Sequence, residues 1–255
     1  LDAVKQIKEV ERKRIKEYLS YRMKNEEPFH LVDAVKEFGF ESLDEYFNAK
    51  KEYEFSQLNF ELIIKEPNNC IAEGLRLLDT QTTAIVFVDC DETFVYSGES
   101  KPFNEDYCKD NNIPIYPLYT AGGAIVGVHG DFSIGICVPE SIGCDSRFMM
   151  KKVQELLSMN ADSITIDSND ILYNGNKICA VTGYNKNGMY LFIAHFSFSD
   201  RIDLISEICA IPTEVSTFSL RRTVTYQPDK MPSYIDFMTR EQLKQEVLAW
   251  QNISI

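Results

Sequence analysis

The sequence predicts an α+β fold, with largely antiparallel sheets flanked by helices and a small helical module in front of them. Three observations carry this prediction. Short runs rich in β-branched and aromatic residues alternate with amphipathic segments of helical period. Many neighbouring β-rich runs are joined by short turn signals built from Asn, Gly, Ser and Asp, which favour hairpins and therefore antiparallel pairing. The first part of the chain, in contrast, has helical periodicity and no β-rich run.

The composition is that of an ordinary soluble globular protein, with 255 residues, 44% hydrophobic and 25% charged. No run approaches the ~18 apolar residues of a membrane span, and the first residues are charged throughout, so we expect neither a membrane segment nor a signal peptide. The formal net charge of −13 disfavours nucleic-acid binding, because phosphate contacts need clustered Lys and Arg. Seven cysteines without a CxxC pair predict a reducing, cytoplasmic location and no structural zinc site.

Residues 1–56 are predicted to form the helical module. Apolar residues recur at helical spacing until the Glu-Glu-Pro at residues 26–28 ends the first helix. A shorter helix is expected to end at Gly39, and Ser42 with Glu45 three residues later is a capping-box pattern at the start of a third. These helices carry acids as well as bases, which favours a packing or interaction module over a DNA-binding helix-turn-helix.

Residues 57–255 are predicted to form the second domain, in which helices and strands are interleaved. Helices are expected where apolar residues recur at helical spacing, at residues 68–80 (with an Asn cap), 104–112, 146–160 and 239–252. Strands are expected at the β-rich runs, residues 59–66, 83–91, 92–100, 113–120, 131–140, 163–168, 170–174, 177–185 and 189–199. The last four strands are separated by Ser-Asn-Asp, Asn-Gly-Asn and Asn-Lys-Asn-Gly, which are turn signals.

The segment PLYTAGGAIVGVHGDFSI, residues 117–134, places two adjacent glycines after a strand. Glycine allows positive φ and close approach of the backbone to a ligand. Gly122 and Gly123 therefore mark either a ligand-binding turn or a plain hairpin corner, and the residues by themselves leave both interpretations open.

Four segments, in this order and spacing, resemble the lipoate–protein ligase, octanoyltransferase and biotin–protein ligase superfamily, and most closely lipoate–protein ligase. They are NNCIAEGLRLL, IVFVDCDETFVYSGES, YTAGGAIVGVHGD and SNDILYNGNKICAVT. The resemblance covers roughly residues 60–250. It implies a lipoate/biotin ligase-like catalytic domain in which the glycine-rich segment lies along an acyl chain and a nucleotide. The ligand-binding residues that it implies are Ala121, Gly122, Gly123, Ala124, Asp131, Asn169 and Asp170.

Lys177 is the main candidate catalytic residue. It follows the turn at residues 174–176 and begins an otherwise apolar strand, so its ammonium group can reach into a pocket. The resemblance implies that it neutralises carboxylate and phosphate oxygens while an acyl-adenylate forms and reacts, which is preorganised positive charge where negative charge develops. The residue pattern alone, without the resemblance, favours a solvent-facing hairpin lysine.

Several positions depart from the family pattern on the side that handles phosphate. Where the ligases carry arginines before the glycine loop, this sequence has Pro117, Leu118 and Tyr119. None of these grips a phosphate as a guanidinium does. Gly127 occupies the usual histidine position, and His129 is displaced from it. The resemblance implies a lipoate or octanoyl group as ligand, whereas the use of ATP and Mg²⁺ is left open because the loop arginines are missing.

An octanoyltransferase-like reaction without ATP is a further alternative, and it would use Cys209 as a second catalytic residue. The cysteine falls where that branch has its nucleophile, and a nearby ammonium such as that of Lys177 would favour its thiolate. Cys209 has apolar neighbours, so a buried structural cysteine is the competing interpretation. Cys137, Cys179 and His195 lie in apolar strands and are predicted to be core residues, and no residue cluster predicts a resident metal ion.

We therefore predict attachment or transfer of a lipoyl or medium-chain acyl group to a protein lysine. The partner would be a lipoyl-acceptor protein domain, and neither a nucleic acid nor a membrane. The alternative is a non-catalytic member of the family that binds an acyl ligand or a partner protein.

Overall fold

A computed structural model describes residues 36, 39–98, 103–118, 124–200, 202–208 and 233–250. The chain divides into two compact units, Leu1–Leu58 and Asn59–Ile255. The first two helices predicted for the helical module lie almost entirely outside the described residues. The division of the chain into a helical module and a ligase-like domain stays a prediction.

The described part of the first unit is built around α4 (Leu43–Ser56). The Ser42 side chain caps this helix by accepting a hydrogen bond from the backbone N–H of Glu45. The Glu45 carboxylate accepts from the backbone N–H of Glu41, one residue earlier than a capping box requires. Phe40, Tyr46 and Ala49 form a small apolar cluster along the helix.

The second unit is organised around a seven-stranded sheet in the order β1-β2-β6-β10-β9-β8-β7. The bounds are β1 (Glu61–Lys65), β2 (Ala84–Asp89), β6 (Phe132–Pro139), β7 (Ile164–Asp167), β8 (Asp170–Tyr173), β9 (Asn176–Lys186) and β10 (Met189–Phe196). β1 and β2 pair in parallel, and all other neighbours in this sheet are antiparallel. The α+β fold with a largely antiparallel sheet is confirmed.

A three-stranded sheet in the order β4-β3-β5 accompanies the large one. It consists of β3 (Phe94–Gly98), β4 (Ile115–Leu118) and β5 (Ile125–Gly127), with β3 parallel to β4 and antiparallel to β5. The two parallel pairs were not expected from the turn signals. Each joins strands separated by a helix, α5 (Pro67–Thr80) between β1 and β2 and α6 (Glu105–Asp110) between β3 and β4, which are the crossovers that parallel pairing needs.

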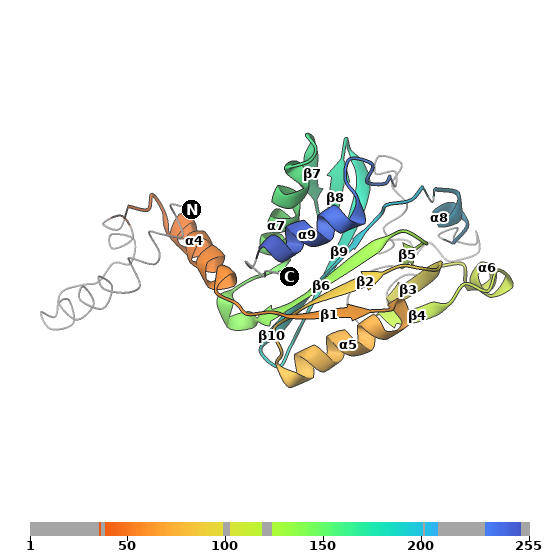
Figure 1. Ribbon diagram of the computed structural model, residues 1–255, viewed down its shortest axis with the longest axis horizontal. Coiled ribbons are helices and arrows are strands. Elements are labelled where there is room, and N and C mark those ends of the chain that lie inside the picture. The colour runs from red at the N-terminus through yellow and green to blue at the C-terminus, as the bar shows by residue number, and fades with distance from the viewer. Residues whose placement is uncertain are drawn as a thin grey trace, which may run out of the picture. The chain divides into compact units, whose positions relative to one another are not determined.

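The two faces of the large sheet are covered by different helices (Figure 1). On one face, α5 packs against the central strands, and its Leu77 and Leu78 are fully buried against Val86 and Leu191. We call this the α5 face. The other, the α9 face, is covered by α7 (Ser146–Ser158) and α9 (Arg240–Ala249). Burying each of these leucines contributes about 1.5–3 kcal/mol, so α5 is firmly attached to the sheet.

Helix ends in the second unit follow the expected capping chemistry, with one correction. Asn104, Asp145 and Thr239 cap α6, α7 and α9 by accepting a backbone N–H. α5 was expected to start with an Asn cap, but it begins at Pro67, and Glu66 is the residue at the N-cap position. Proline at the first helical position lacks only an N–H that would be unpaired anyway. α8 (Ile202–Ile208) was not expected from the sequence.

Two-residue turns set the hairpins β8–β9 and β9–β10. Asn174 and Gly175 have φ of 50° and 80°, and Asn187 and Gly188 have 54° and 75°. This left-handed pair of residues is the Asn-Gly turn whose twist matches that of the flanking strands. None of the helices in the described ranges is both long and apolar enough to span a bilayer.

Candidate acyl-binding site

An apolar cavity lies between the α5 face of the large sheet and the elements that cover it. Its atom-free space is about 470 Å³, counting the part open to solvent. The sheet supplies Val86, Val88, Ser133, Gly135, Leu191, Ile193 and His195, and the covering elements supply Cys70, Ile71 and Gly74 from α5 and Tyr96, Leu118 and Ile125 from the small sheet. A mostly apolar cavity with a few polar groups at one end is typical of a small-molecule site.

The cavity has an apolar end and a polar end, which lie along the strand direction. Leu191 and Gly74 mark the apolar end, where a Cβ on Gly74 would lie 2.8 Å from the Leu191 side chain. His195 marks the polar end, four residues along β10 from Leu191, which corresponds to about 13 Å of strand.

Three buried polar side chains contact one another in sequence at the polar end. Ser133 and His195 are directly opposite each other on β6 and β10. Ser133 Oγ lies 2.8 Å from His195 Nδ1, and His195 Nε2 lies 3.3 Å from Asp131 Oδ2. The exposed fractions of Asp131, Ser133 and His195 are 0%, 4% and 1%, so this is polar chemistry inside the protein.

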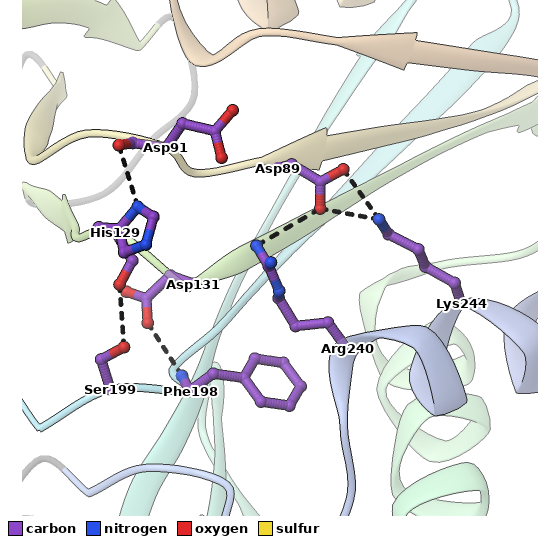
Figure 2. Close-up of polar contacts among 8 residues, drawn as sticks. All are labelled: Asp89, Asp91, His129, Asp131, Phe198, Ser199, Arg240 and Lys244. Carbon is purple, nitrogen blue, oxygen red and sulfur yellow. Dashed lines mark hydrogen bonds and ion pairs between the residues drawn. The ribbon is translucent and has the colours of Figure 1, made fainter.

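Asp131 is held in place by the turn that precedes β6. Its Oδ1 accepts from the backbone N–H of Phe198 at 2.9 Å (Figure 2), and its Oδ2 accepts from that of Val128 at 3.2 Å. Gly130 has φ of 96° in this turn, which explains the glycine of the His-Gly-Asp sequence. His129 is exposed, with Nδ1 3.1 Å from the backbone oxygen of Asp91. The buried carboxylate therefore faces the imidazole of His195 and not the surface.

Lys177 reaches the α5 face because of an irregularity in the β8–β9 pairing. Asp170 pairs with Ala180, but Leu172, two residues on, pairs with Lys177 instead of Ile178. One extra residue on β9 is a β-bulge, and it reverses the side on which the following side chain projects. Lys177 therefore shares the face of Asp170, and its Nζ lies 2.6 Å from Asp170 Oδ1.

A single row across the sheet connects the cavity with this ion pair. The register places Ser133 opposite His195, His195 opposite Ala180, and Ala180 opposite Asp170. Residues opposite one another in antiparallel strands project to the same face. Since neighbouring strands lie about 4.8 Å apart, the backbone of Asp170 is about 10 Å from that of His195, across the small side chain of Ala180.

The other reactive side chains of the cavity wall are held in their protonated forms. Tyr96 donates from its hydroxyl to the backbone oxygen of Pro67 at 2.8 Å, and the Cys70 thiol lies 2.6 Å from the same hydroxyl. Burial raises the pKa of Cys70 from 9.0 to about 11, and burial likewise raises the pKa of Tyr96 well above its ordinary value. At neutral pH the Cys70 side chain is therefore a thiol and a weak nucleophile.

The structure describes only some of the predicted site residues. Ala121, Gly122, Gly123 and Cys209 lie outside the described residues, so the acyl slot and the cysteine nucleophile stay predictions. Ala124 packs in an apolar cluster with Val126 and Ile208 and does not line the cavity. Asn169 is exposed in the β7–β8 turn and accepts from the backbone N–H of Val181 at 3.0 Å.

The sequence did not indicate Ser133 as a site residue. It predicted the burial of His195 and the loss of an arginine at Leu118, but not that both residues line the cavity. His195 is buried, as predicted for a core residue, but it also lines the cavity and contacts Ser133. Leu118, one of the residues found in place of the expected arginines, forms part of the apolar wall. One sequence signal could have indicated the pair. Ser133 is a polar residue near the start of one apolar strand, and His195 is a polar residue near the end of another.

The fold of this chain is similar to that of several solved structures, although no relative is found by sequence. No sequence-family profile matches the chain, and no curated protein matches it in sequence. The bipartite lipoate protein ligase of Thermoplasma acidophilum superposes with a TM-score of 0.61 at 18% identity, over 76% of this chain and 82% of the other. LipL1 of P. falciparum, in complex with lipoate, gives 0.61 at 10% identity, over 75% and 62%.

A lipoate-protein ligase A bound with ATP also matches, with a TM-score of 0.51 at 17% identity, over 76% of this chain and 94% of that one. The chain has the lipoate protein ligase fold. The resemblance predicted from the four sequence segments is thus confirmed at the level of the fold. Within the lipoate protein ligase fold of this chain, the apolar cavity, the buried Asp131 cluster and the Lys177 ion pair lie on one face of one sheet.

The described residues around the cavity include few groups that could hold a nucleotide or a metal ion. Among the described residues, no group of three or more His, Cys, Asp or Glu side chains could hold a metal ion. Asp170, one of the ligand-binding residues that the resemblance implies, is paired with Lys177, and the wall at Leu118 is apolar. The described wall of the cavity is mostly apolar and carries no Arg or Lys side chain that could pair with a phosphate.

Proposed function

We propose that this protein binds a lipoyl or medium-chain acyl group in the apolar cavity and attaches or transfers it to a lysine of an acceptor protein. One observation carries the proposal: the polar end of an apolar cavity lies in the same cross-strand row as Asp170, the partner of Lys177. The fold supports it, because the structures with this fold include proteins named as lipoate protein ligases.

The division of the cavity suggests how the ligand would lie. The tail would run along the strands toward Leu191 and Gly74, where its burial contributes about 0.8 kcal/mol for each methylene group. Its carbonyl would lie at the His195 end, beside the buried polar cluster. Lys177 would place its ammonium at the open end of the row, where a carboxylate, a leaving group or an attacking amine would develop or lose charge.

Two sources of the activated acyl group are compatible with this arrangement, a free acid and an acyl thioester. A free acid must be activated by ATP, whereas an acyl thioester already carries a leaving group. Leu118 in the cavity wall, in place of a guanidinium, favours the thioester, because a lost charge-assisted hydrogen bond costs about 1.5–3 kcal/mol of binding. ATP and Mg²⁺ remain the alternative, and a solved protein of this fold does bind ATP.

The proposed partner is a lipoyl-acceptor protein domain. The T. acidophilum ligase was described together with its E2 lipoyl domain, which makes this class of acceptor the natural one to test. The net charge of −13 on the present chain means that an acidic acceptor would be repelled at long range and would need local contacts to dock. The proposal does not involve nucleic acid.

Titration calorimetry followed by a transfer assay tests the proposal. The full chain is titrated with lipoate and with octanoate, and then incubated with a purified lipoyl-acceptor domain plus either octanoate with ATP–Mg²⁺ or an octanoyl thioester. The expected result is binding of both acids and a mass increase of the acceptor in the thioester reaction. Binding without transfer in either reaction would favour the non-catalytic alternative, and no binding at all would overturn the proposal.

A further inference from the structure

Ser133 has a geometry that the proposed function does not use. It projects into the polar end of the cavity from β6, and its hydroxyl is 2.8 Å from an imidazole nitrogen of His195. The other imidazole nitrogen is 3.3 Å from the fully buried carboxylate of Asp131. A hydroxyl, an imidazole and a carboxylate in this sequence of contacts are the parts of an activated serine nucleophile.

The buried carboxylate determines where the imidazole proton lies. An ionised carboxylate only accepts hydrogen bonds, and Asp131 already accepts the backbone N–H groups of Val128 and Phe198. The neutral His195 ring therefore carries its hydrogen on Nε2, toward Asp131. In that tautomer Nδ1 is an acceptor, and the Ser133 hydroxyl, 2.8 Å away, is placed to donate to it. This is the orientation in which the imidazole can remove the serine proton.

Ser133 is also better placed than the neighbouring thiol of Cys70. Cys70 lines the same cavity, but its sulfur contacts the Tyr96 hydroxyl and has no imidazole beside it among the contacts described. Burial keeps that thiol protonated at neutral pH. Of the two, only Ser133 has a base in hydrogen-bonding distance. The cross-strand register holds that base in place, because Ser133 and His195 are paired residues on adjacent central strands.

We propose that Ser133 accepts the acyl group from a thioester as an ester intermediate, with His195 as general base and Asp131 as the residue that positions the imidazole. The nature of the acyl group rests on the proposed function. The inference gives the chain a reaction that consumes no ATP. It also assigns the covalent step to a residue of β6, 44 positions from Lys177 in the sequence.

The chemistry is redox-neutral and balances in two steps. Ser133 Oγ attacks the thioester carbonyl, its proton moves to His195 Nδ1, and the C–S bond breaks as that proton passes to the departing thiolate. The amine of the acceptor lysine then attacks the ester carbonyl, a proton from the amine moves to His195 Nδ1, and the C–O bond breaks as Ser133 Oγ recovers a proton. The products are a free thiol and an amide.

Labelling with a serine-directed reagent is the first experiment, and it does not depend on any acceptor. The full chain is incubated with an alkyl fluorophosphonate and followed by intact mass and peptide mapping. We expect one label on Ser133, no label on Ser133→Ala, and labelling of His195→Gln slowed by about 10²–10⁴-fold through loss of the base. Ser146→Ala is the matched control, because Ser146 also makes a short hydroxyl contact, 2.6 Å to Tyr190, but contacts no imidazole there.

The second experiment looks for the intermediate itself. After incubation with an octanoyl thioester and acid quenching, the chain should carry one octanoyl group that maps to Ser133. A serine ester resists neutral hydroxylamine, whereas a cysteine thioester is cleaved by it. A hydroxylamine-sensitive adduct on Cys209 or another cysteine, or an unmodified chain during acceptor turnover, would overturn the proposal for Ser133.

Asp131→Asn tests the positioning role separately. Asparagine still accepts a hydrogen bond through its oxygen, but its NH₂ group would donate to His195 Nε2 and drive the imidazole to the opposite tautomer. The acylation rate should fall by up to about 10⁴-fold near neutral pH while the melting temperature changes far less, as for the corresponding aspartate of the serine protease triad. An unchanged pH profile of acylation would show that Asp131 has only a structural role.

The two proposals fail in different ways. If Ser133→Ala transfers octanoyl groups as fast as the unaltered chain, while Lys177→Met does not, the serine proposal is wrong and the proposed function stands. If lipoate and octanoate do not bind, but a short-chain fluorophosphonate still labels Ser133, the acyl assignment is wrong and the activated serine stands. Failure of both experiments removes both.

Discussion

The α5 face and the α9 face of the large sheet each carry a lysine–aspartate ion pair, and the two pairs differ in how they are held. On the α9 face, Lys244 of α9 donates to both oxygens of Asp89 at 2.8 Å, with Arg240 at 3.6 Å from the same carboxylate (Figure 2). The Lys244 ammonium also lies 5.0 Å from the centre of the Phe132 ring. On the α5 face, Lys177 contacts one oxygen of Asp170 at 2.6 Å.

The surroundings of each pair decide how firmly its lysine is held. Lys244 joins α9 to the end of β2 and contacts a ring of the core, so its ammonium is held between two groups, the Asp89 carboxylate and the Phe132 ring. Lys177 is paired with Asp170 on the neighbouring strand of its own hairpin. Asp170 lies opposite the half-buried Ala180, in the cross-strand row that leads to the cavity. Its ammonium can leave Asp170 without detaching any element, which a residue acting on a substrate requires.

Replacing Lys177 or Lys244 by methionine should have its largest effect on the rate of acyl transfer, and the effect should differ between the two lysines. Methionine keeps an unbranched side chain and removes the charge. Lys177→Met is expected to lower the rate of acyl transfer by about 10²–10³-fold, the typical effect of removing one preorganised electrostatic group. Lys244→Met, the matched control, should stay within a few-fold of the unaltered chain. Comparable losses in both, measured as initial rates of acceptor acylation, would remove the distinction between the faces.

The buried thiol of Cys137, on the α5 face, should make the protein sensitive to alkali. Burial raises its pKa from 9.0 to about 11, so the folded state holds the thiol proton more tightly than the unfolded chain does. The associated stability is complete below pH 9 and is lost as the pH rises through about 11. The loss amounts to about 3 kcal/mol of unfolding free energy.

Denaturant unfolding of the unaltered chain and of Cys137→Ala at several pH values between 8 and 11 checks this expectation. The alanine variant starts from a lower stability because it leaves a small cavity, so the informative quantity is the slope with pH and not the absolute value. Its slope should be shallower. Parallel slopes would mean that Cys137 is more accessible to water than its burial indicates.

In unfolding free energy, the order of the two methionine variants should be the opposite: Lys244→Met should lose more stability than Lys177→Met. The Lys244 and Asp89 side chains are 22% and 30% exposed, and losing the lysine leaves a partly buried carboxylate with only the more distant Arg240. We expect Lys244→Met to cost about 1–2 kcal/mol. The Lys177 side chain is 37% exposed, and an ion pair that close to solvent contributes about 0–1 kcal/mol. Chemical denaturation measures both, and a larger cost for Lys177 would contradict the assignment of Lys244 to attachment.

Gly135 offers the smallest and most specific test of the α5 face. It lines the cavity floor, and a Cβ there would lie 3.5 Å from Val86, an ordinary contact that the fold tolerates. Gly135→Ala adds one methyl group to the floor. It should weaken binding of longer acyl chains a few-fold relative to shorter ones, because filling space in a close-packed cavity removes room for the tail. Calorimetry with a series of fatty acids measures the ratio, and an unchanged ratio would place the tail elsewhere.

The sequence predicted the elements of the second domain well because the relevant signals are local. The Asn-Gly pairs predicted the hairpins of β8, β9 and β10, and those turns are found with the left-handed backbone that such pairs favour. The two parallel pairs were missed, since no turn signal announces a strand partner that lies beyond a helix. The family resemblance singled out Lys177 and Asp170, which the structure does bring together.

The sequence by itself thus determined most of the strands and helices, though not β5 and α8, together with the hairpin turns and the presence of a lysine and an acid beside one of those turns. Only the tertiary structure decided what faces the cavity. Ser133 and His195 are 62 residues apart, and they meet because the register of β6 against β10 makes them opposite one another. Lys177 joins their face only through the bulge opposite Leu172. Local periodicity reports whether a residue is on a strand, but strand register and bulges depend on the packing of distant segments, and a shift of one residue would move each of these side chains to the other face.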